Sequence, residues 1–225
     1  MNSEILRKRI MKWGASIVGF GNLDDLLSDE LKRLHIGISI AIKLSNAIID
    51  GIKEAPTFTY AHHYRVTNQL LDFVALKASN LLQSWGYEAF PIPASQIVDD
   101  EKLEGLFPHK TVATRASLGW IGKSALLITP EYGPRVRLVS VLTDAPLEVS
   151  LPISESRCGQ CSLCVEACPA KALTGKSWQE ETKREELVDV GLCREVTQRN
   201  KIKFGEPICG ICVSVCPFGK ANTRT

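Results

Sequence analysis

Cysteines carry the chemistry that this sequence is best equipped to perform. The run Arg157–Pro169, RCGQCSLCVEACP, contains Cys158, Cys161, Cys164 and Cys168. The spacing CxxCxxCxxxCP is typical of 4Fe–4S binding, in which the first three thiolates bind one cluster and the fourth binds the other cluster of a pair. Pro169 ends this loop, because proline opens a new segment more readily than it continues an old one.

A second run supplies the other ligands. Cys209, Cys212 and Cys216 form CGICVSVCP, and Cys193 precedes them. If the two runs exchange their fourth ligands, the eight cysteines divide into two sets of four. We call the first set quartet one (Cys158, Cys161, Cys164, Cys216) and the second quartet two (Cys168, Cys193, Cys209, Cys212). The sequence therefore predicts two 4Fe–4S clusters as cofactors.

Other uses of eight thiols were weighed against this one. Two structural zinc sites are an alternative, since CxxC pairs are common zinc ligands, but zinc rarely uses CxxCxxC followed by Cys-Pro. Disulfides fit less well, because residues 1–21 contain no apolar run of secretory length. A reducing cytoplasm, the predicted location, would keep the thiols available for metal.

Length and composition set further bounds. The chain has 225 residues, 44% hydrophobic and 23% charged, as in an ordinary globular protein. No stretch reaches the length of apolar residues that a membrane span requires. The formal net charge is +2, and the basic residues are dispersed. This balance does not predict a nucleic-acid partner and does not exclude one.

The distribution of the cysteines along the chain predicts two domains, whose helices and strands must position the thiols. All eight cysteines follow residue 150, which predicts an N-terminal domain over residues 1–150 and a C-terminal ferredoxin-like domain over residues 151–225. In the N-terminal part, helix and strand patterns alternate, which is typical of an α/β (α+β) fold. We expect helices over 3–14, 24–34, 44–53, 60–85 and 111–116, and strands over 16–20, 35–44, 87–92, 125–129 and 135–143, the last two paired as a hairpin.

Outside the cysteines, the loop Ser117–Lys123, SLGWIGK, is the most informative stretch. Gly119 and Gly122 would let a ligand approach the backbone, Trp120 offers a flat apolar face, and Lys123 adds a cation. The pattern differs from a phosphate-binding P-loop. A tight turn around a core tryptophan explains it equally well.

Several stretches together resemble the epoxyqueuosine reductase family, which is related to the reductive dehalogenases. They are TRASLGWIGK (114–123), LLITPEYGPRVRLVSVLTDAPL, CGQCSLCVEACPAKAL, GICVSVCPFGK and TYAHHYRVTNQLLD. The resemblance runs in order from Tyr60 onward. It implies a cobalamin in the α/β domain beside two 4Fe–4S clusters, with Arg115, Gly119, Trp120, Gly122 and Lys123 at the corrinoid.

The sequence departs from the family pattern at the proton donor. In the family an aspartate upstream of the LGW loop donates the proton, and the matching position here is near Leu103. The resemblance therefore leaves Glu101 and Glu104 as the nearest carboxylates, with Asp99 and Asp100 further away. Tyr60 and His63 are the other candidate acids, because a neutral histidine can transfer protons near neutral pH. Members of the family are also longer than this chain.

These observations predict an iron–sulfur oxidoreductase that passes electrons to cobalamin or to a small substrate. A small-molecule or protein substrate and an electron donor such as a ferredoxin or flavodoxin would be its partners. Two alternatives remain: a ferredoxin-type electron carrier or activator of a partner enzyme, and a tRNA epoxyqueuosine reductase.

Overall fold

The computed structural model describes residues 3–101 and 103–220. Its helices are α1 (Ser3–Lys12), the 3-10 helix η1 (Lys32–Leu34), α2 (Asn46–Asp50), α3 (Phe58–Ser84), α4 (His109–Arg115), α5 (Leu163–Glu166), α6 (Arg184–Leu187), α7 (Val190–Phe204) and α8 (Ile211–Val215). Its strands are β1 (Ile17–Asn22), β2 (Ile36–Lys43), β3 (Ala89–Ile92), β4 (Trp120–Ile121), β5 (Leu127–Ile128) and β6 (Val136–Thr143). The predicted combination of helices and strands is confirmed.

Two compact units share these elements, and neither is continuous in sequence. Unit 1 contains residues 1–43, 67–119 and 137–153; unit 2 contains residues 44–66, 120–136 and 154–225. This division differs from the expected cut near residue 150, because segments 44–66 and 120–136 pack with the cysteine-bearing part of the chain. The sequence suggested the simpler cut because it shows where the cysteines lie and not what packs against them.

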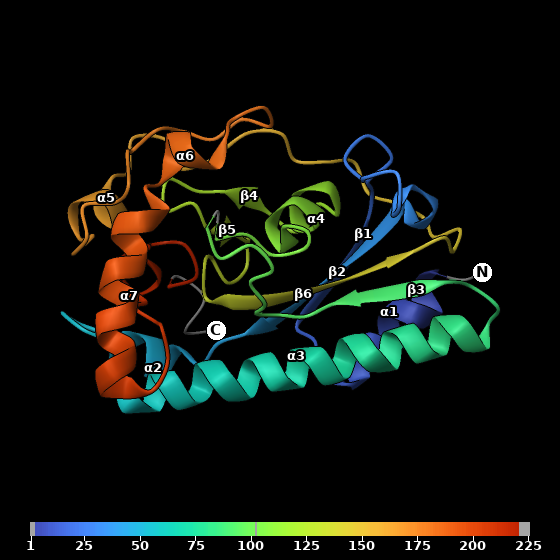
Figure 1. Ribbon diagram of the computed structural model, residues 1–225, viewed down its shortest axis with the longest axis horizontal. Coiled ribbons are helices and arrows are strands. Elements are labelled where there is room, and N and C mark those ends of the chain that lie inside the picture. Colours follow the sequence, from blue (N-terminus) through green and yellow to red (C-terminus); the bar gives the residue numbers. More distant parts are fainter. Residues whose placement is uncertain (1–2, 102, 221–225) are drawn as a thin grey trace. The chain divides into compact units, whose positions relative to one another are not determined.

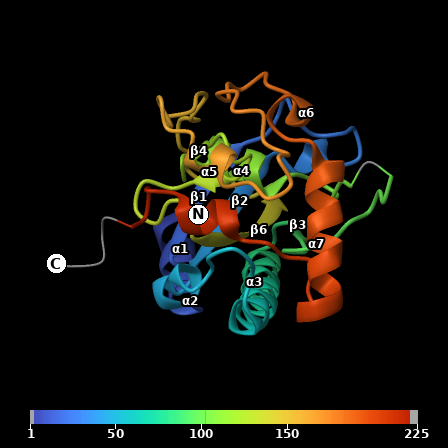
Figure 2. The same ribbon diagram turned by 90° about the vertical axis from the view of Figure 1, so that its left-hand side faces the viewer.

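Unit 1 is built on a four-stranded sheet in the order β1-β2-β6-β3. The pairs β1–β2 and β3–β6 are antiparallel. In Figures 1 and 2, α1 and the later turns of α3 cover one face of this sheet, and α4 lies on the other. Each face of the sheet is therefore covered by at least one helix, as in other layered α/β domains.

Strand β2 shows how the sequence specifies these two faces. Its side chains alternate, and Ile36, Ile38, Ile40 and Ile42 all enter the core beneath α1 and α3. The opposite face carries small residues, so α4 can approach closely. At Gly21 of β1, an added Cβ would lie 2.5 Å from the Arg115 backbone carbon. A side chain there would push the end of α4 away from the sheet.

Two expected elements are wrong. Residues 24–34 form turns and the short helix η1 in place of a full helix. Asn22 accepts a hydrogen bond from the Asp24 amide, which starts a turn and competes with helix formation.

The expected hairpin between 125–129 and 135–143 is also absent, since β5 pairs with β4 while β6 joins the large sheet. The apolar pattern of β5 is compatible with pairing to β4 and with pairing to β6. The turn residues at 130–134 do not specify which of the two forms.

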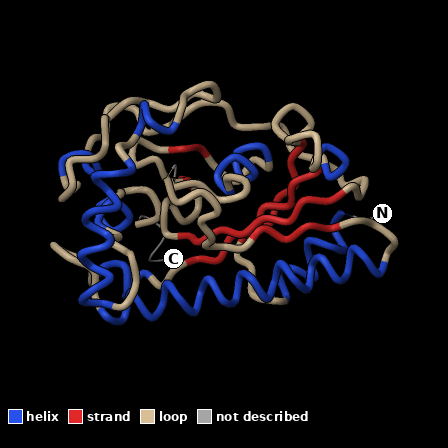
Figure 3. Tube along the Cα trace, viewed as in Figure 1, coloured by secondary structure: helices blue, strands red, loops and turns tan. Residues whose placement is uncertain are grey.

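Unit 2 consists largely of loops that join the long helix α7 to several short helices (Figure 3). Its apolar cluster comes from distant parts of the chain: Leu44, Ile49, Ile52, Tyr60, Ala61, Ile208, Ile211 and Val213. Arg135 adds a buried polar link, being only 1% exposed and donating to Asp50 at 2.6 Å and to Asn46 at 3.1 Å. This hydrogen bond from Arg135 lowers the pKa of the Asp50 carboxyl. Within the described residues, no helix is long and apolar enough to cross a membrane.

His109 fixes the start of α4 in unit 1. One ring nitrogen, Nδ1, lies 2.9 Å from the Ser140 hydroxyl, and the other, Nε2, lies 3.0 Å from the Pro93 carbonyl. A neutral ring satisfies both contacts by donating from Nε2 and accepting at Nδ1. Burial lowers the pKa of His109; nearby Arg137 lowers it further, while the Pro93 carbonyl and Asp72 oppose the shift.

This geometry predicts a loss of stability in mild acid. Because its pKa is lower when folded, His109 stabilises the protein above the ordinary value of 6.5, and that contribution falls as the pH drops below it toward the folded pKa. Urea unfolding of wild type should show a lower midpoint at about pH 5.5 than at about pH 7.5. His109→Gln should reduce this difference, because glutamine does not titrate. An unchanged difference in the variant would assign the pH dependence to other groups.

Candidate functional site

The cysteines lie at the ends of short helices and in the loops between them. Cys164 is in α5, Cys193 is in α7 and Cys212 is in α8, while the other five lie in loops or at helix ends. Gly210 permits the second run to fold this way. Its φ is +81°, and an added Cβ would lie 2.7 Å from the Tyr60 ring. The glycine in CGIC is therefore required both by backbone conformation and by packing.

Quartet one gathers cysteines from both runs. Burial raises the pKa of the Cys164 thiol, and the neighbouring Cys158 and Cys161 raise it further. Burial also raises the pKa of Cys216 to about 11, and the same cysteines act on it, namely Cys158, Cys164 and Cys161. Cys216 is distant in sequence from these three residues, yet it responds to their charges. The fold thus places Cys216 near the first run, and its sharing of one cluster with those three cysteines stays a prediction.

Quartet two is assembled in the same way. Burial raises the pKa of Cys193, with further contributions from Cys209 and Cys168. Burial also raises the pKa of Cys209, and Cys168 adds to the effect. For Cys212, burial is again the largest cause, followed by Cys209, Cys193, Cys164 and Cys168. Cys168 thus lies with the second run. Cys164 is the one member of quartet one that acts on Cys212, so the two quartets are neighbours.

The eight thiols suit two iron–sulfur clusters. No three His, Cys, Asp or Glu side chains among the described residues converge as they would around a single metal ion. The thiolates of a 4Fe–4S cluster bind separate iron atoms, so four sulfurs can surround the cluster without meeting at one point. All eight cysteines are free of disulfides. Because several of their pKa values are raised, cluster binding must displace protons, and loading should be favoured at higher pH.

The loop Ser117–Lys123 supports the first cysteine run. At Gly122, an added Cβ would lie 2.7 Å from Ile128 and 3.3 Å from the Cys158 sulfur. Lys123 donates a 2.9 Å hydrogen bond to the Gly159 carbonyl, inside the CGQC turn. Trp120 is only 3% exposed and packs edge-on against Phe218, with ring centroids 5.2 Å apart. Trp120, Gly122 and Lys123 therefore all pack against or bond to other parts of the protein beside quartet one.

The other two residues expected at a corrinoid belong to unit 1. Gly119 is buried where the two units meet in the sequence. Arg115 ends α4 and donates to Asp25 at 2.8 Å, a hydrogen bond that lowers the pKa of the Asp25 carboxyl. A role of Arg115, Gly119, Trp120, Gly122 and Lys123 in binding a corrinoid stays a prediction.

Tyr60 and His63 lie at the start of α3, in unit 2. Tyr60 is 4% exposed and belongs to the apolar cluster that contacts Cys209 and Cys212. His63 accepts a 3.0 Å hydrogen bond at Nε2 from the Ser45 amide, which precedes α2. Burial, with a smaller contribution from His62, lowers the pKa of His63. Its Nε2 is engaged in a structural contact, so proton transfer from that atom would require this contact to break.

Glu101 and Glu104 lie in unit 1 and are exposed. The Glu104 backbone pairs with Asp99, and the Glu101 amide donates to the Asp99 carboxylate at 3.0 Å. Leu103, at the position where the family has its proton donor, has a φ of +56°. Such a conformation is uncommon for leucine and marks a tight loop. Glu101 and Glu104 therefore lie on either side of Leu103, and both residues are exposed.

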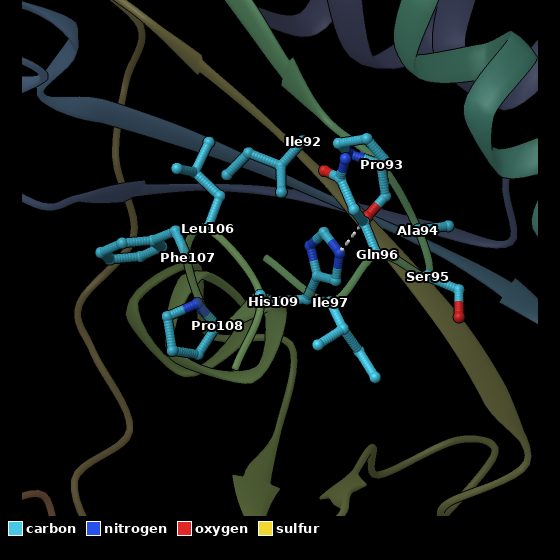
Figure 4. Close-up of a pocket in the computed structure, with 11 residues that line it drawn as sticks. Ile92, Pro93, Ala94, Ser95, Gln96, Ile97, Leu106, Phe107, Pro108 and His109 are labelled. Atoms are coloured by element: carbon cyan, nitrogen blue, oxygen red, sulfur yellow. Dashed lines mark hydrogen bonds between the residues drawn. The ribbon is translucent and has the colours of Figure 1, made fainter. Parts of the chain in front are cut away.

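A pocket of about 200 Å³ lies next to this turn (Figure 4). The residues that line it come from two segments, one on each side of the turn: Ile92, Pro93, Ala94, Ser95, Gln96 and Ile97, then Gly105, Leu106, Phe107, Pro108 and His109. Most of the lining is apolar. Sequence reasoning missed this pocket because its segment shows neither helical nor strand periodicity, although the prolines at 91, 93 and 108 signalled a fixed loop.

A matched pair of variants tests the ligand exchange. Cys168→Ser lies in the first run but should remove the cluster of quartet two, and Cys216→Ser lies in the second run but should remove the cluster of quartet one. Each variant should retain about four of about eight iron atoms per chain. Anaerobic iron and sulfide analysis with EPR would identify the surviving cluster. Loss of the cluster in the same run as the mutation would contradict the exchange, and zinc in place of iron would exclude both clusters.

Comparisons with known proteins agree with this geometry. Residues 157–219 match the family described as the 4Fe-4S double cluster binding domain. An epoxyqueuosine reductase of Listeria monocytogenes is 35% identical over 150 residues, which cover 63% of this chain and 37% of the relative. A tetrachloroethene reductive dehalogenase of Sulfurospirillum multivorans is 35% identical over 124 residues, covering 49% of this chain and 23% of the relative.

Solved structures show the same fold. A selenomethionine-labelled epoxyqueuosine reductase superimposes with a TM-score of 0.67 at 21% identity, covering 99% of this chain and 66% of the other. A reductive dehalogenase described as B12-dependent gives a TM-score of 0.73 at 20% identity, covering 98% of this chain and 32% of the other. This chain thus spans between about a quarter and two thirds of these relatives. The chain is similar to epoxyqueuosine reductases and reductive dehalogenases over these stretches, and its residues 157–219 match the 4Fe-4S double cluster binding domain.

Proposed function

We propose that this protein is an iron–sulfur reductase that removes the epoxide oxygen of epoxyqueuosine in tRNA. The redox part is supported by the match of residues 157–219 to the 4Fe-4S double cluster binding domain and by the approach of cysteines from both runs to one another. When bound, two 4Fe–4S clusters supply single electrons in sequence. The tRNA substrate is supported by the relatives named epoxyqueuosine reductase, one of which was solved with an epoxyqueuosine-modified tRNA stem loop. This choice replaces the small-molecule substrate favoured by the sequence.

The proposed reaction needs electrons and protons in equal number. Reducing an epoxide to an alkene takes two electrons and two protons, and it releases the oxygen as water. The clusters account for the electrons. Glu101 and Glu104 are better placed than His63 to supply a proton, because they are exposed beside the pocket and His63 is held by the Ser45 amide. A cobalamin at the α/β domain would supply the reactive metal, as in the B12-dependent dehalogenase of the same fold.

Reconstituted protein would test this proposal. The protein is loaded anaerobically with iron and sulfide, mixed with hydroxocobalamin, and supplied with a low-potential reductant and epoxyqueuosine-containing tRNA. Nucleoside mass spectrometry should show conversion to queuosine. A Glu101→Gln/Glu104→Gln double variant should keep both clusters and lose about a hundredfold in rate, the low end for removal of a general acid. Wild type that holds both clusters and cobalamin but does not convert the tRNA would refute the substrate.

A dedicated electron carrier is the second candidate. It is favoured by the contacts of the loop Ser117–Lys123, where Trp120 is buried and Lys123 is bonded to the Gly159 carbonyl. An electron carrier needs clusters and a surface on which its partners dock, but it needs no binding site for a further cofactor. Retention of hydroxocobalamin after gel filtration under reducing conditions separates the two functions. A protein with both clusters and no retained corrinoid would be assigned as a carrier.

Electrons are expected to enter through quartet two. Cys193 is exposed, whereas the seven other cysteines are partly covered. It lies on α7, whose outer surface carries the exposed cations Arg199, Lys201 and Lys203 around Ile202, which is 90% exposed. An apolar centre with a basic surround suits an acidic one-electron carrier such as a ferredoxin or flavodoxin, because opposite charges accelerate association.

Charge reversal on α7 tests this entry route. Arg199→Glu/Lys203→Glu should lower the rate of cluster reduction by a ferredoxin or flavodoxin about tenfold at low salt, and the defect should shrink at high salt as charges are screened. Stopped-flow absorbance would follow the reduction. Reduction by dithionite, a small molecule that needs no docking, should be unchanged and serves as the control. Equal protein-driven rates in variant and wild type would place the donor elsewhere.

A further inference from the structure

Trp120 stands out because its one polar atom is buried and unpaired. The indole Nε1 has no hydrogen-bond partner among the described residues, and the residue is only 3% exposed. Buried N–H groups are almost always paired in folded proteins. Trp120 is also fixed in place, since it pairs with Ile128 in the β4–β5 hairpin. Its N–H is therefore a fixed donor that requires an acceptor.

The residues around the indole locate this donor beside quartet one. Arg157, whose guanidinium carbon lies 5.7 Å from the ring centroid, precedes Cys158. Phe218, in edge contact with the ring, follows Cys216 by two positions. Gly122, two residues after Trp120, brings the backbone close to the Cys158 sulfur. Trp120 thus contacts one residue next to Cys158, the first ligand of quartet one, and one residue close to Cys216, the last.

The immediate neighbours provide no acceptor of their own. Phe218 has only a hydrocarbon ring, Arg157 presents a cation, and Ile128 has an aliphatic side chain. The thiolates of quartet one, whose neighbours border the ring, and the sulfides that a cluster would bring are candidate acceptors. Sulfur bound to iron is an established acceptor, and hydrogen bonds to it are one of the ways in which a protein sets the reduction potential of a cluster.

We propose that the Trp120 indole N–H donates a hydrogen bond to a sulfur of the quartet-one cluster and raises its reduction potential. This inference depends on the clusters and not on the tRNA substrate. Reduction adds an electron to the cluster, and a donor aimed at its sulfur stabilises the added charge. A higher potential at quartet one favours electron flow from quartet two, where Cys193 is exposed, toward quartet one. Trp120 is then a positioning and tuning residue.

Trp120→Phe tests the proposal because it keeps an aromatic ring and removes the N–H. Redox titration followed by EPR should show a lower midpoint potential for the quartet-one cluster and an unchanged one for the quartet-two cluster. The second cluster is an internal control in the same molecule. Trp178→Phe, which alters another buried tryptophan of unit 2, should change neither potential. An unchanged quartet-one potential in Trp120→Phe with full iron content would overturn the proposal.

A measurement on the unmutated side chain covers the case in which Trp120→Phe fails to fold. Wild-type protein grown with tryptophan labelled with ¹⁵N in the indole should show a ¹⁵N hyperfine coupling to the reduced quartet-one cluster. Trp178→Phe protein should keep this coupling. Absence of coupling in labelled wild type, with both clusters present, would refute the hydrogen bond. Iron and sulfide analysis on the same sample separates this outcome from failure to bind clusters at all.

Discussion

The approach of cysteines from two runs that are distant in sequence is the constraint on which unit 2 depends. Cys168 lies with Cys193 and Cys209, while Cys216 lies with Cys158 and Cys164. Two clusters bound with the proposed exchange of ligands would tie the first run to the segment around Cys216. Metal–thiolate bonds of this kind contribute directly to folding free energy, because the preformed site does not exist in the unfolded chain.

The secondary structure of unit 2 shows why such bonds are needed. Helices α5, α6 and α8 contain only four or five residues each, which is too short for a helix to be stable alone. The apolar cluster around Tyr60 and Ile211 is small beside the core of unit 1, where α1, α3 and four strands pack together. Unit 1 is thus held by apolar burial, and unit 2 by a smaller core together with its cluster ligands.

The loop Ser117–Lys123 links this requirement to function. Gly122 admits the Cys158 sulfur, Lys123 holds the CGQC turn through Gly159, and Trp120 packs between Arg157 and Phe218. A loop that resembles a ligand-binding motif in sequence is thus also part of the wall around the first cluster. One set of residues can then shape the cluster's surroundings and set its potential, without taking part in bond breaking.

The sequence alone determined what is local. Ligand spacing within CxxCxxCxxxCP is set by a few backbone bonds, so the two clusters could be predicted, while the exchange of ligands stays a prediction. The helical periodicity of α3 and the alternation of β2 could also be recognised in the sequence. Tertiary structure decided what depends on distant partners. β5 pairs with β4 and not with β6, segments 44–66 and 120–136 join the cysteine-bearing unit, and Trp120 is buried with an unpaired N–H. A residue's own pattern shows that it will be buried or paired, but its partners are chosen by packing across the whole chain, where many pairings satisfy the same local pattern.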